Sequence, residues 1–293
     1  LEEALKLRKK FSFGNIYILN GIQKKEYGII NKNKLVPIIN SIEELKLIKK
    51  KIRTKGNFNI GIHVDTGINR LGINYKDINK IKFNHTEPII LISHLSSSEE
   101  RKNNYNNIQN VKFKKIINLF RYIKFKSLSN SMGALLGKNY HYDMIRPGIA
   151  IYGGHYNNRL LKKNIKPVVT LKARILQIKN ITKNEFIGYN QTYKAKKNLT
   201  IAILGIGYAD GISRKLSNKG NVYYKNYKFN IIGRVSMDSI TIDISSKKNQ
   251  IKRGQYMEII NKNNDIEKFA KNCNTISNEI LTSISERVTR IYI

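Results

Sequence analysis

The sequence predicts an α/β protein with two domains: a partial (β/α)8 barrel over residues 1–163 and an antiparallel β domain over residues 164–293. In the first half, strands and helices alternate at about 25–35 residues per unit, which indicates a parallel sheet with helical crossovers. In the second half, short alternating runs lie between Gly, Asn and Asp turns, a pattern typical of antiparallel strands. The chain opens inside an amphipathic helix, so we expect a barrel without its opening strands rather than an open doubly wound sheet.

Six strand–helix units are expected in the first domain, where a closed barrel needs eight. Residues 41–44 read S-x-x-E, a capping box that begins a helix. The expected helices cover the opening residues and residues 42–52, 75–83 and 102–122, and the expected strands cover residues 15–19, 34–39, 59–65, 88–94, a run ending in 127–131 and a weaker one near 144–151.

The longest expected helix, over residues 102–122, has apolar residues at helical spacing. Such spacing predicts that this face of the helix is buried against the sheet. The residues of the expected face are Ile108, Val111, Ile116, Leu119 and Phe120.

The β domain is expected to contain several short strands joined by turns. A closing run, residues 287–293, is expected to pair back into the same sheet. The other expected strands cover residues 168–178, 199–205, 221–224, 229–232 and 239–244.

Composition excludes some classes of protein. Hydrophobic residues make up 41% of the 293-residue chain and aromatic residues 9%, as in a globular protein rather than a disordered one. The formal charge of +34 would ordinarily suggest a nucleic-acid partner. The lysines are spread evenly, however, and accompany an abundance of Ile and Asn. We interpret the charge as a drift in genome composition and expect no nucleic-acid partner.

The sequence shows no membrane span, signal peptide or metal motif. No stretch approaches the roughly 20 apolar residues of a membrane span. The single cysteine, Cys273, excludes an internal disulfide and fits a reducing compartment, so a cytoplasmic location is expected. The five histidines include no H-E-x-x-H, and there is no cysteine pair, so no metal site is expected. A G-x-S-x-G nucleophile elbow is also absent from the sequence.

Polar residues follow the ends of several expected strands in the first domain. Ligand sites of parallel α/β folds lie at the carboxyl ends of strands, so these residues are candidates for one site. The Ser131 hydroxyl, together with the backbone N–H groups of Gly148 and Ile149, predicts a phosphate-binding cradle. The candidate residues are Arg70, His94, Asn130, Ser131, Arg146, Gly148 and Ile149.

Three glycine-containing motifs of the second domain carry further candidates: GYNQTY (188–193), GYADG (207–211) and GRVSMD (233–238). A phenol in such a loop can act as an acid or a base, although tyrosine also packs in ordinary β sheets. We expect Tyr193 to be a packing residue. Spacing alone does not separate Tyr189 from Tyr208 as the functional phenol.

Together the motifs resemble the alanine racemases, fold-type III enzymes that use pyridoxal 5′-phosphate. HVDTGINRLG, the strand ending in Ser93-His94, LSNS, MIRPGIAIYG, IGYNQTY, GIGYADG, GRVSMDSITID and RVTRIY occur in that family's order and spacing, over essentially the whole chain. The family fold is a TIM-type barrel followed by a β domain. The resemblance implies interconversion of L-alanine and D-alanine for cell-wall peptidoglycan, a small amino-acid substrate and a homodimer with shared active sites.

The resemblance also implies roles for individual residues. Arg146 would face the pyridine nitrogen and leave it unprotonated, which makes the cofactor ring a weaker electron sink. Tyr189 would be one of two catalytic bases, reaching into the partner subunit's site, and His94 would hydrogen-bond its phenol. The remaining assignments are cofactor binding by Asn130, Ser131, Gly148 and Ile149, substrate binding by Arg70 and Met237, and an entry channel of Tyr208, Arg214, Arg234 and Glu99.

Three positions depart from the pattern of the family. His63 stands where many members have a lysine that becomes carbamylated and orients the arginine equivalent to Arg70. Imidazole cannot form that carbamate, which leaves a bound anion as a substitute. Asn190 replaces the usual glycine after the catalytic tyrosine, and Glu286 stands where some members have a phosphate-binding tyrosine.

The cofactor lysine of the family would precede Leu1, and no lysine of this chain lies in a matching motif. Because the count of barrel units also falls short by two, we expect a fragment or truncated product without racemase activity of its own. The alternatives are a racemase for another small amino acid such as serine, a degenerate relative without catalysis, and a basic nucleic-acid-binding protein.

Overall fold

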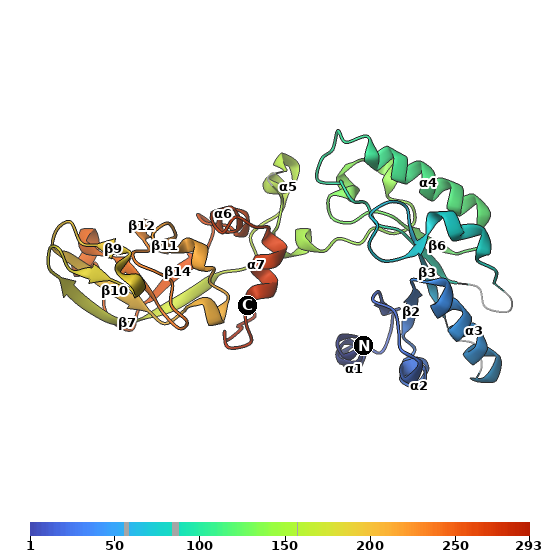
Figure 1. The fold of residues 1–293 in the computed structure, drawn as a ribbon, viewed down its shortest axis with the longest axis horizontal. Helices are drawn as coiled ribbons and strands as arrows, with labels where there is room; N and C mark the ends of the chain where they lie inside the picture. Colours follow the sequence, from blue (N-terminus) through green and yellow to red (C-terminus); the bar gives the residue numbers. More distant parts are fainter. Residues whose placement is uncertain (56–58, 84–87, 157) are drawn as a thin grey trace. The chain divides into compact units, whose positions relative to one another are not determined.

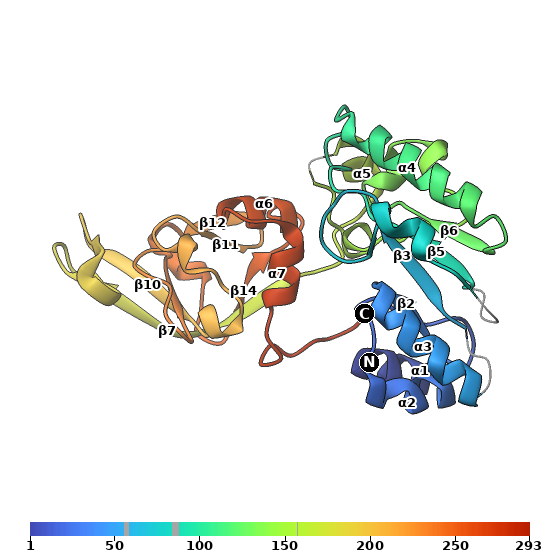
Figure 2. The same cartoon turned by 45° about the vertical axis from the view of Figure 1, so that its right-hand side comes forward.

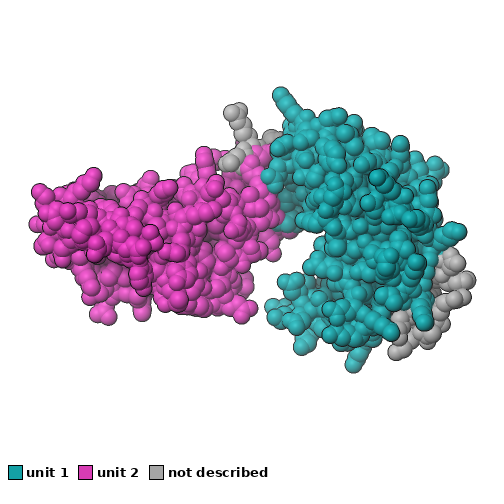
Figure 3. Space-filling model, viewed as in Figure 1, with its two compact units in different colours: residues 1–148 teal, residues 149–293 magenta. Residues whose placement is uncertain are grey.

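The computed structural model describes residues 1–55, 59–83, 88–156 and 158–293. The chain forms two compact units, residues 1–148 and residues 149–293 (Figure 3). The change of domain that we expect at residues 163 and 164 falls inside the second unit and stays a prediction.

In the described residues, the first unit is built on five parallel strands in the order β1-β2-β3-β5-β6, with the short strand β4 paired to β3. Figure 1 labels β2, β3 and β6 of this sheet. A 3₁₀ helix, Tyr75–Lys80, occupies most of the segment expected to be helical over 75–83. The elements are α1 (Glu2–Lys10), β1 (Tyr17–Ile18), α2 (Tyr27–Lys32), β2 (Val36–Ile39), α3 (Ile42–Lys55), β3 (Gly61–Asp65), β4 (Ile73–Asn74), β5 (Ile90–Ile92), α4 (Tyr105–Leu119) and β6 (Phe125–Ser127).

The helices α3 and α4 cover the outer face of this sheet (Figure 2). Ile62 and Val64 of β3 point to that face and share one buried cluster with Leu45 of α3 and Phe113 of α4. The expected cap begins α3, because the Ser41 hydroxyl accepts the backbone N–H of the third residue along at 3.0 Å. The alternation predicted from the sequence therefore positions β3 with its apolar side toward the helices.

The opposite, inner face of the sheet carries Gly61 and His63, since successive side chains of a strand alternate between faces. A Cβ at Gly61 would lie 2.3 Å from Ile38 Cδ1 and 2.6 Å from Ile90 Cγ2. Only glycine therefore lets these two isoleucines meet across β3, and both belong to the buried inner-face cluster. His63 lies one strand repeat further along the same face.

The weak strand expected near residues 144–151 is wrong. Residues 144–148 are irregular, and Ile149–Tyr152 form a 3₁₀ helix. The backbone N–H of Arg146 donates to Ser129 O at 2.9 Å, and its guanidinium donates to the Ser127 hydroxyl at 2.5 Å. Arg146, together with the bond from the Ser127 hydroxyl to Met144 O, therefore holds this segment in place of a strand ladder.

The expected buried face of α4 is wrong in three of its five residues. Ile116 and Phe120 are buried as predicted, but Ile108, Val111 and Leu119 are exposed. Polar side chains turn inward instead because they bond to the backbone at strand ends and in the loops that follow, as the Asn106 and Gln109 amides do. The buried residues of α4 are Asn106, Gln109, Asn110, Phe113 and Ile116.

The second unit confirms the expected antiparallel β domain. Its main sheet has the order β12-β11-β14-β7-β10-β13, and β8 and β9 form a separate hairpin. The strand β14, the hairpin and the two last helices lie outside the expected set. The elements are α5 (Arg159–Asn164), β7 (Leu171–Ile181), β8 (Phe186–Ile187), β9 (Tyr193–Lys194), β10 (Leu199–Leu204), β11 (Asn221–Tyr224), β12 (Tyr227–Asn230), β13 (Ile240–Asp243), β14 (Tyr256–Ile260), α6 (Ile266–Asn272) and α7 (Ser277–Ser283).

The core of the second unit packs helix α6 against the main sheet. Phe269 and Cys273 join the cluster that holds Leu204 and Met257 of the strands. Burial raises the pKa of the Cys273 thiol to about 11. In the described part of the chain, no helix has the length and apolar character needed to cross a membrane.

The closing strand expected over residues 287–293 is wrong, because these residues form no strand. The Arg290 guanidinium instead folds back to donate to Ile284 O at 2.9 Å, and Ile291, Tyr292 and Ile293 are exposed. Arg287 Nη2 donates to Asp238 Oδ1 at 2.6 Å, and Arg287 Nε lies 3.4 Å from Asp210 Oδ1. Arginine side chains thus take the place of the ladder that the β-rich sequence predicted.

Candidate active site

Arg146 is the centre of the polar residues at the strand ends of the first unit. Its Nη2 donates to Ser93 O, at the end of β5, at 2.6 Å, and its Nη1 donates to the Ser127 hydroxyl at the end of β6. Nη2 also lies 3.5 Å from His94 Nδ1. Burial lowers the pKa of the guanidinium to about 10, so Arg146 keeps its charge at neutral pH. The structure therefore places a fixed cation between two strand ends.

His94 lies between this arginine and Asn130. The Asn130 Oδ1 accepts from Ser98 Oγ at 2.9 Å and from Gly133 N at 2.8 Å, so its Nδ2 is the atom that faces His94 Nε2, at 3.4 Å. Burial, followed by the charges of Arg146 and a second arginine, lowers the pKa of His94 to about 4. His94 is consequently a neutral imidazole at physiological pH.

A neutral imidazole has one acceptor nitrogen and one N–H, yet donors face both ring nitrogens of His94. The two contacts, at 3.4 and 3.5 Å, are long for hydrogen bonds. One ring N–H is therefore without a good acceptor in this arrangement. An incoming oxygen, such as that of a phenol, would satisfy it.

Ser131 and Gly148 form two parts of the expected phosphate cradle. Ser131 is buried, and its Oγ accepts from Gly148 N at 2.9 Å. A Cβ built on Gly148 would meet no atom within 4 Å, so space is open beside this amide. Ile149, the third expected part, is the first residue of the second unit. The structure thus brings the Ser131 hydroxyl and the Gly148 N–H within hydrogen-bond distance of each other, and their role in phosphate binding stays a prediction.

Arg70 is held by the turn that ends β3. Asp65 Oδ1 accepts from Gly67 N at 2.7 Å and from Ile68 N at 2.9 Å, and its Oδ2 accepts from Arg70 N at 3.1 Å. One carboxylate thereby fixes the backbone up to Arg70. The arginine side chain is exposed, and its charge helps to lower the pKa of His94.

Gln109, which was not among the residues predicted from the sequence, ties the ends of β3 and β5 together from α4. Its Nε2 donates to His94 O at 3.0 Å and to Thr66 Oγ1 at 3.2 Å, and its Oε1 accepts from Ser96 N at 2.9 Å. The side chain is fully buried. The only signal in the sequence is a run of amide residues inside an otherwise apolar helix pattern.

The second unit brings together the three loops that carry Tyr189, Tyr208 and Met237. A Cβ on Gly188 would lie 3.0 Å from Arg234 N, and one on Gly207 would lie 2.2 Å from Met237 O. These two glycines therefore allow the loops to touch backbone to backbone. Tyr189, Tyr208 and Met237 are 66%, 44% and 52% exposed, so their side chains are available to a ligand or a partner.

Asn190 adopts φ 57° and ψ 21°, a left-handed conformation that asparagine tolerates better than most residues. Asparagine can therefore stand here in place of the family's usual glycine while the turn keeps its conformation. Tyr193 packs against the small buried cluster near the β8–β9 hairpin, as expected.

The expected entry-channel residues divide between the units. Glu99 is exposed in the first unit, whereas Arg214 is exposed in a 3₁₀ helix of the second and Arg234 is half-buried there. Their shared role stays a prediction. In the parts of the chain that the structure describes, no group of three or more His, Cys, Asp or Glu could hold a metal ion.

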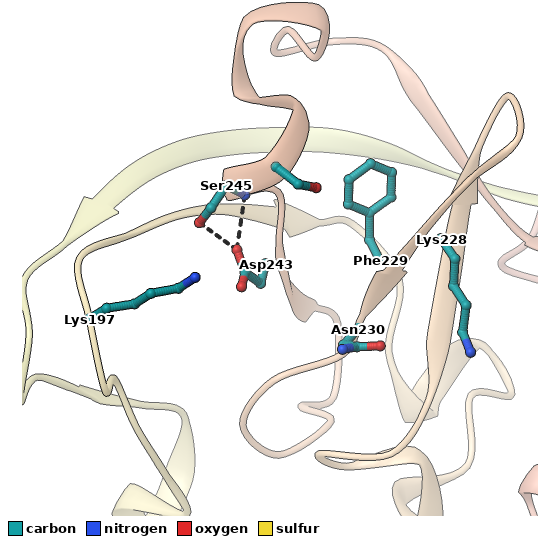
Figure 4. A pocket seen from close by; sticks show the side chains of 7 residues that line it. Lys197, Lys228, Phe229, Asn230, Asp243 and Ser245 are labelled. Atoms are coloured by element: carbon teal, nitrogen blue, oxygen red, sulfur yellow. Dashed lines mark hydrogen bonds between the residues drawn. The ribbon is translucent and has the colours of Figure 1, made fainter.

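A cavity of about 310 Å³ in the second unit is separate from all of these residues (Figure 4). Asp243, on its wall, already accepts from both the N–H and the hydroxyl of Ser245, so its Oδ1 is satisfied within the wall. The lining consists of Lys197, Lys228, Phe229, Asn230, Asp243, Ser245 and Ser246. The site proposed from the sequence does not include it.

Comparison with known protein families identifies the family to which this chain belongs. The family model described as "Alanine racemase, N-terminal domain" matches residues 1–156, and "Alanine racemase, C-terminal domain" matches residues 168–292. The chain belongs to the alanine racemase family. The expected fold class, a TIM-type barrel domain followed by an antiparallel β domain, is confirmed by solved structures of the same family.

Among curated relatives, the alanine racemase of Rickettsia bellii is 39% identical and is matched over 99% of this chain and 72% of its own length. The alanine racemase of Brucella suis is 36% identical over 95% of this chain and 75% of its own. The crystal structure of alanine racemase from Bartonella henselae with covalently bound pyridoxal phosphate superposes with a TM-score of 0.92. The two sequences are 34% identical, and the match covers 100% of this chain and 83% of the Bartonella henselae chain.

Proposed function

We propose that this protein interconverts L-alanine and D-alanine, as an isomerase with pyridoxal 5′-phosphate as its cofactor. The observation that carries the proposal is the buried, charged Arg146 between the ends of β5 and β6, beside a neutral His94 and the Ser131–Gly148 pair. Membership of the alanine racemase family supports the reaction. The covalently bound pyridoxal phosphate of the Bartonella henselae structure supports the cofactor.

The residues at the strand ends fit this cofactor. When bound, pyridoxal phosphate withdraws electrons from the substrate Cα and makes its proton removable. The Ser131 hydroxyl and the Gly148 N–H would hold the phosphate. The Arg146 guanidinium would donate to the ring nitrogen. Since its pKa stays near 10, it donates a hydrogen bond without giving up its proton, which keeps electron withdrawal moderate and limits side reactions.

Arg70 would bind the carboxylate of the amino acid. A guanidinium pairs with a carboxylate through two parallel hydrogen bonds, and the Asp65-held turn fixes the backbone from which Arg70 extends. Met237 would provide an apolar contact to the substrate. Alanine is the substrate named for the curated relatives, and serine is the competitor to test.

Racemisation requires a base on each face of the substrate Cα, so one lysine of a cofactor enzyme cannot serve both. We propose the exposed Tyr189 phenol as the second base, acting at the site of a second copy of the chain in a two-fold homodimer. His94, with a ring N–H that lacks a good acceptor, would hold the phenol oxygen.

Mixing two variants tests this proposal in the protein expressed from its complete reading frame. Tyr189→Phe should reduce alanine racemisation by at least about 10²-fold, as expected for a lost general base, while absorbance of the bound cofactor stays normal. Arg70→Ala should be similarly impaired. Mixed dimers of the two should regain activity, since one of their two sites keeps both residues. Mixed dimers without recovered activity would disprove the shared site, and faster racemisation of serine than of alanine would reassign the substrate.

The proposal includes supply of D-alanine for cell-wall peptidoglycan from the cytoplasm. The bacterial origin of the relatives supports this role, and the buried free thiol of Cys273 is in keeping with a reducing compartment. Expression in a bacterial strain that requires D-alanine should allow growth without it. A strain that still needs D-alanine while making active enzyme would contradict the role.

A further inference from the structure

His63 of β3 presents a buried nitrogen that has no hydrogen-bond partner among the residues that the structure describes. The side chain is 7% exposed and lies on the inner face of β3, one strand repeat before Asp65. Among the residues that the structure describes, its Nε2 is one of few buried side-chain polar atoms that lack a partner. Buried polar groups are almost always satisfied, so such an atom calls for an explanation.

The surroundings of Asn40 determine which ring nitrogen of His63 carries the proton. The Asn40 Nδ2 donates to Leu19 O at 3.0 Å and to Ile38 O at 2.9 Å, so its two N–H groups are occupied. Its Oδ1 therefore faces His63 Nδ1, at 2.9 Å, and can only accept. Nδ1 must carry the hydrogen.

His63 is also neutral, which makes Nε2 a lone pair. The groups that act on it are Arg146, His94, Asp65 and Arg70. Burial, reinforced by the two arginines and His94 against the opposing effect of Asp65, lowers the pKa of His63 to about 4. A neutral imidazole with its hydrogen on Nδ1 has an acceptor at Nε2. The unpartnered Nε2 therefore requires a hydrogen-bond donor. A bound anion would not satisfy it, because the anion would face the lone pair of Nε2.

Arg70 is the available donor. The two Nη groups of Arg146 are already engaged with Ser127, Ser93 and His94, and the hydrogen bond proposed to the cofactor ring would use its Nε. The guanidinium of Arg70 makes no hydrogen bond to any residue that the structure describes, although its charge acts on His63. The chain returns over the imidazole directly after Arg70, since a Cβ at Gly72 would lie 3.2 Å from His63 Cγ and Cδ2.

We propose that His63 is a positioning residue whose Nε2 accepts a hydrogen bond from the Arg70 guanidinium and so aims that guanidinium at the substrate carboxylate. The hydrogen bond satisfies the buried lone pair and restricts the rotamers of a long, exposed side chain. It replaces the bound anion expected from the sequence. The part that concerns the substrate rests on the proposed function, whereas the contact itself does not.

Nitrogen NMR of the cofactor-loaded protein, labelled with ¹⁵N-histidine, tests the contact directly. His63 is assigned by the signal missing from the His63→Gln variant. We expect a protonated Nδ1 and an unprotonated Nε2 between pH 5.5 and 8, with an Nε2 resonance that changes in Arg70→Ala. The control Arg121→Ala removes an exposed arginine of the same unit and should change nothing. A protonated Nε2, a resonance indifferent to Arg70→Ala, or one that responds to exchanging chloride for gluconate would overturn the proposal.

Kinetics separate positioning from a merely structural role. His63→Leu removes the acceptor and should raise the KM for alanine about 10–100-fold with a smaller change in kcat, because Arg70 binds the carboxylate throughout the reaction. His63→Gln can donate to Asn40 and offer an oxygen to Arg70, so its KM should stay within about threefold. Equal KM values in the two variants, both folded by circular dichroism, would refute the inference. If the parent enzyme racemises nothing while the NMR result holds, the proposed function fails and the contact stands.

Discussion

Replacement of Gln109 by leucine should destabilise the first unit and loosen the strand end that carries His94. The amide donates to His94 O at 3.0 Å and to Thr66 Oγ1 at 3.2 Å, while its own oxygen accepts from Ser96 N. Leucine has a similar volume and forms none of these bonds. The change therefore removes hydrogen bonds without opening a large cavity.

The magnitude depends on which partners can find a substitute. Thr66 keeps its bond to Ser93 Oγ at 2.8 Å, and Ser96, being exposed, can bond to water. Among the described residues, His94 O has no other hydrogen-bond donor. One buried acceptor left unsatisfied costs about 1–3 kcal/mol, and the lost bond to Thr66 adds about 1 kcal/mol. Gln109→Leu should therefore reduce the free energy of unfolding by roughly 2–4 kcal/mol.

Urea unfolding followed by far-ultraviolet circular dichroism measures this loss, since the chain has no tryptophan for fluorescence. Asn107→Leu is the matched control: it makes the same kind of change on the exposed face of α4 and should cost less than about 0.5 kcal/mol. Hydrogen exchange at the Ser96 amide should accelerate only in Gln109→Leu. Equal stabilities of the two variants would show that the buried amide does not hold the strand ends.

Three further changes have defined outcomes. Because the pKa values of His63 and His94 are lowered from 6.5 to about 4, the unfolded chain binds more protons than the folded chain between these pH values. The free energy of unfolding should therefore be full above pH 6.5 and fall toward pH 4, with at most roughly 3 kcal/mol of the loss from His63. Urea unfolding at pH 5 and pH 7 should show this loss, and His63→Gln should lessen it. Gly72→Ala should cost about 2–4 kcal/mol, since φ is 119° and the new Cβ would lie 2.9 Å from a backbone nitrogen; Gly137→Ala, at φ 126° but in open space, should cost about half as much in thermal unfolding. Arg146→Lys keeps the charge but loses the forked contacts and should weaken pyridoxal phosphate binding at least about tenfold by absorbance titration.

The sequence predicted those parts of the fold that depend on local pattern. The alternation of apolar residues predicts β3. The D-T-G turn that follows predicts that Arg70 lies just beyond the end of this strand, because Asp65 bonds to the backbone of its own turn. Parallel order then implies that residues after β5 and β6 share the same edge, which places His94 near Asn130.

What the sequence could not predict depends on partners far along the chain. Gln109 is buried because its amide donates to Thr66 Oγ1 and His94 O, which are 43 and 15 residues away in the sequence. The apolar spacing instead predicted that Val111 and Leu119 would lie on the buried face of α4. The closing residues read as a strand, but Arg290 satisfies nearby carbonyls from its own side chain. Such side-chain solutions leave no periodic trace in a sequence.

The burial of Cys273 has a practical consequence for labelling. Cys273 is the single cysteine of the chain, and with its thiol pKa near 11 almost none of it is the reactive thiolate at neutral pH. A cysteine introduced at an exposed position, such as Lys138 near the strand ends or Lys225 in the β domain, would then react selectively with a maleimide dye without removal of the native thiol. Single introduced cysteines should therefore allow site-specific fluorescence and spin labelling of this protein.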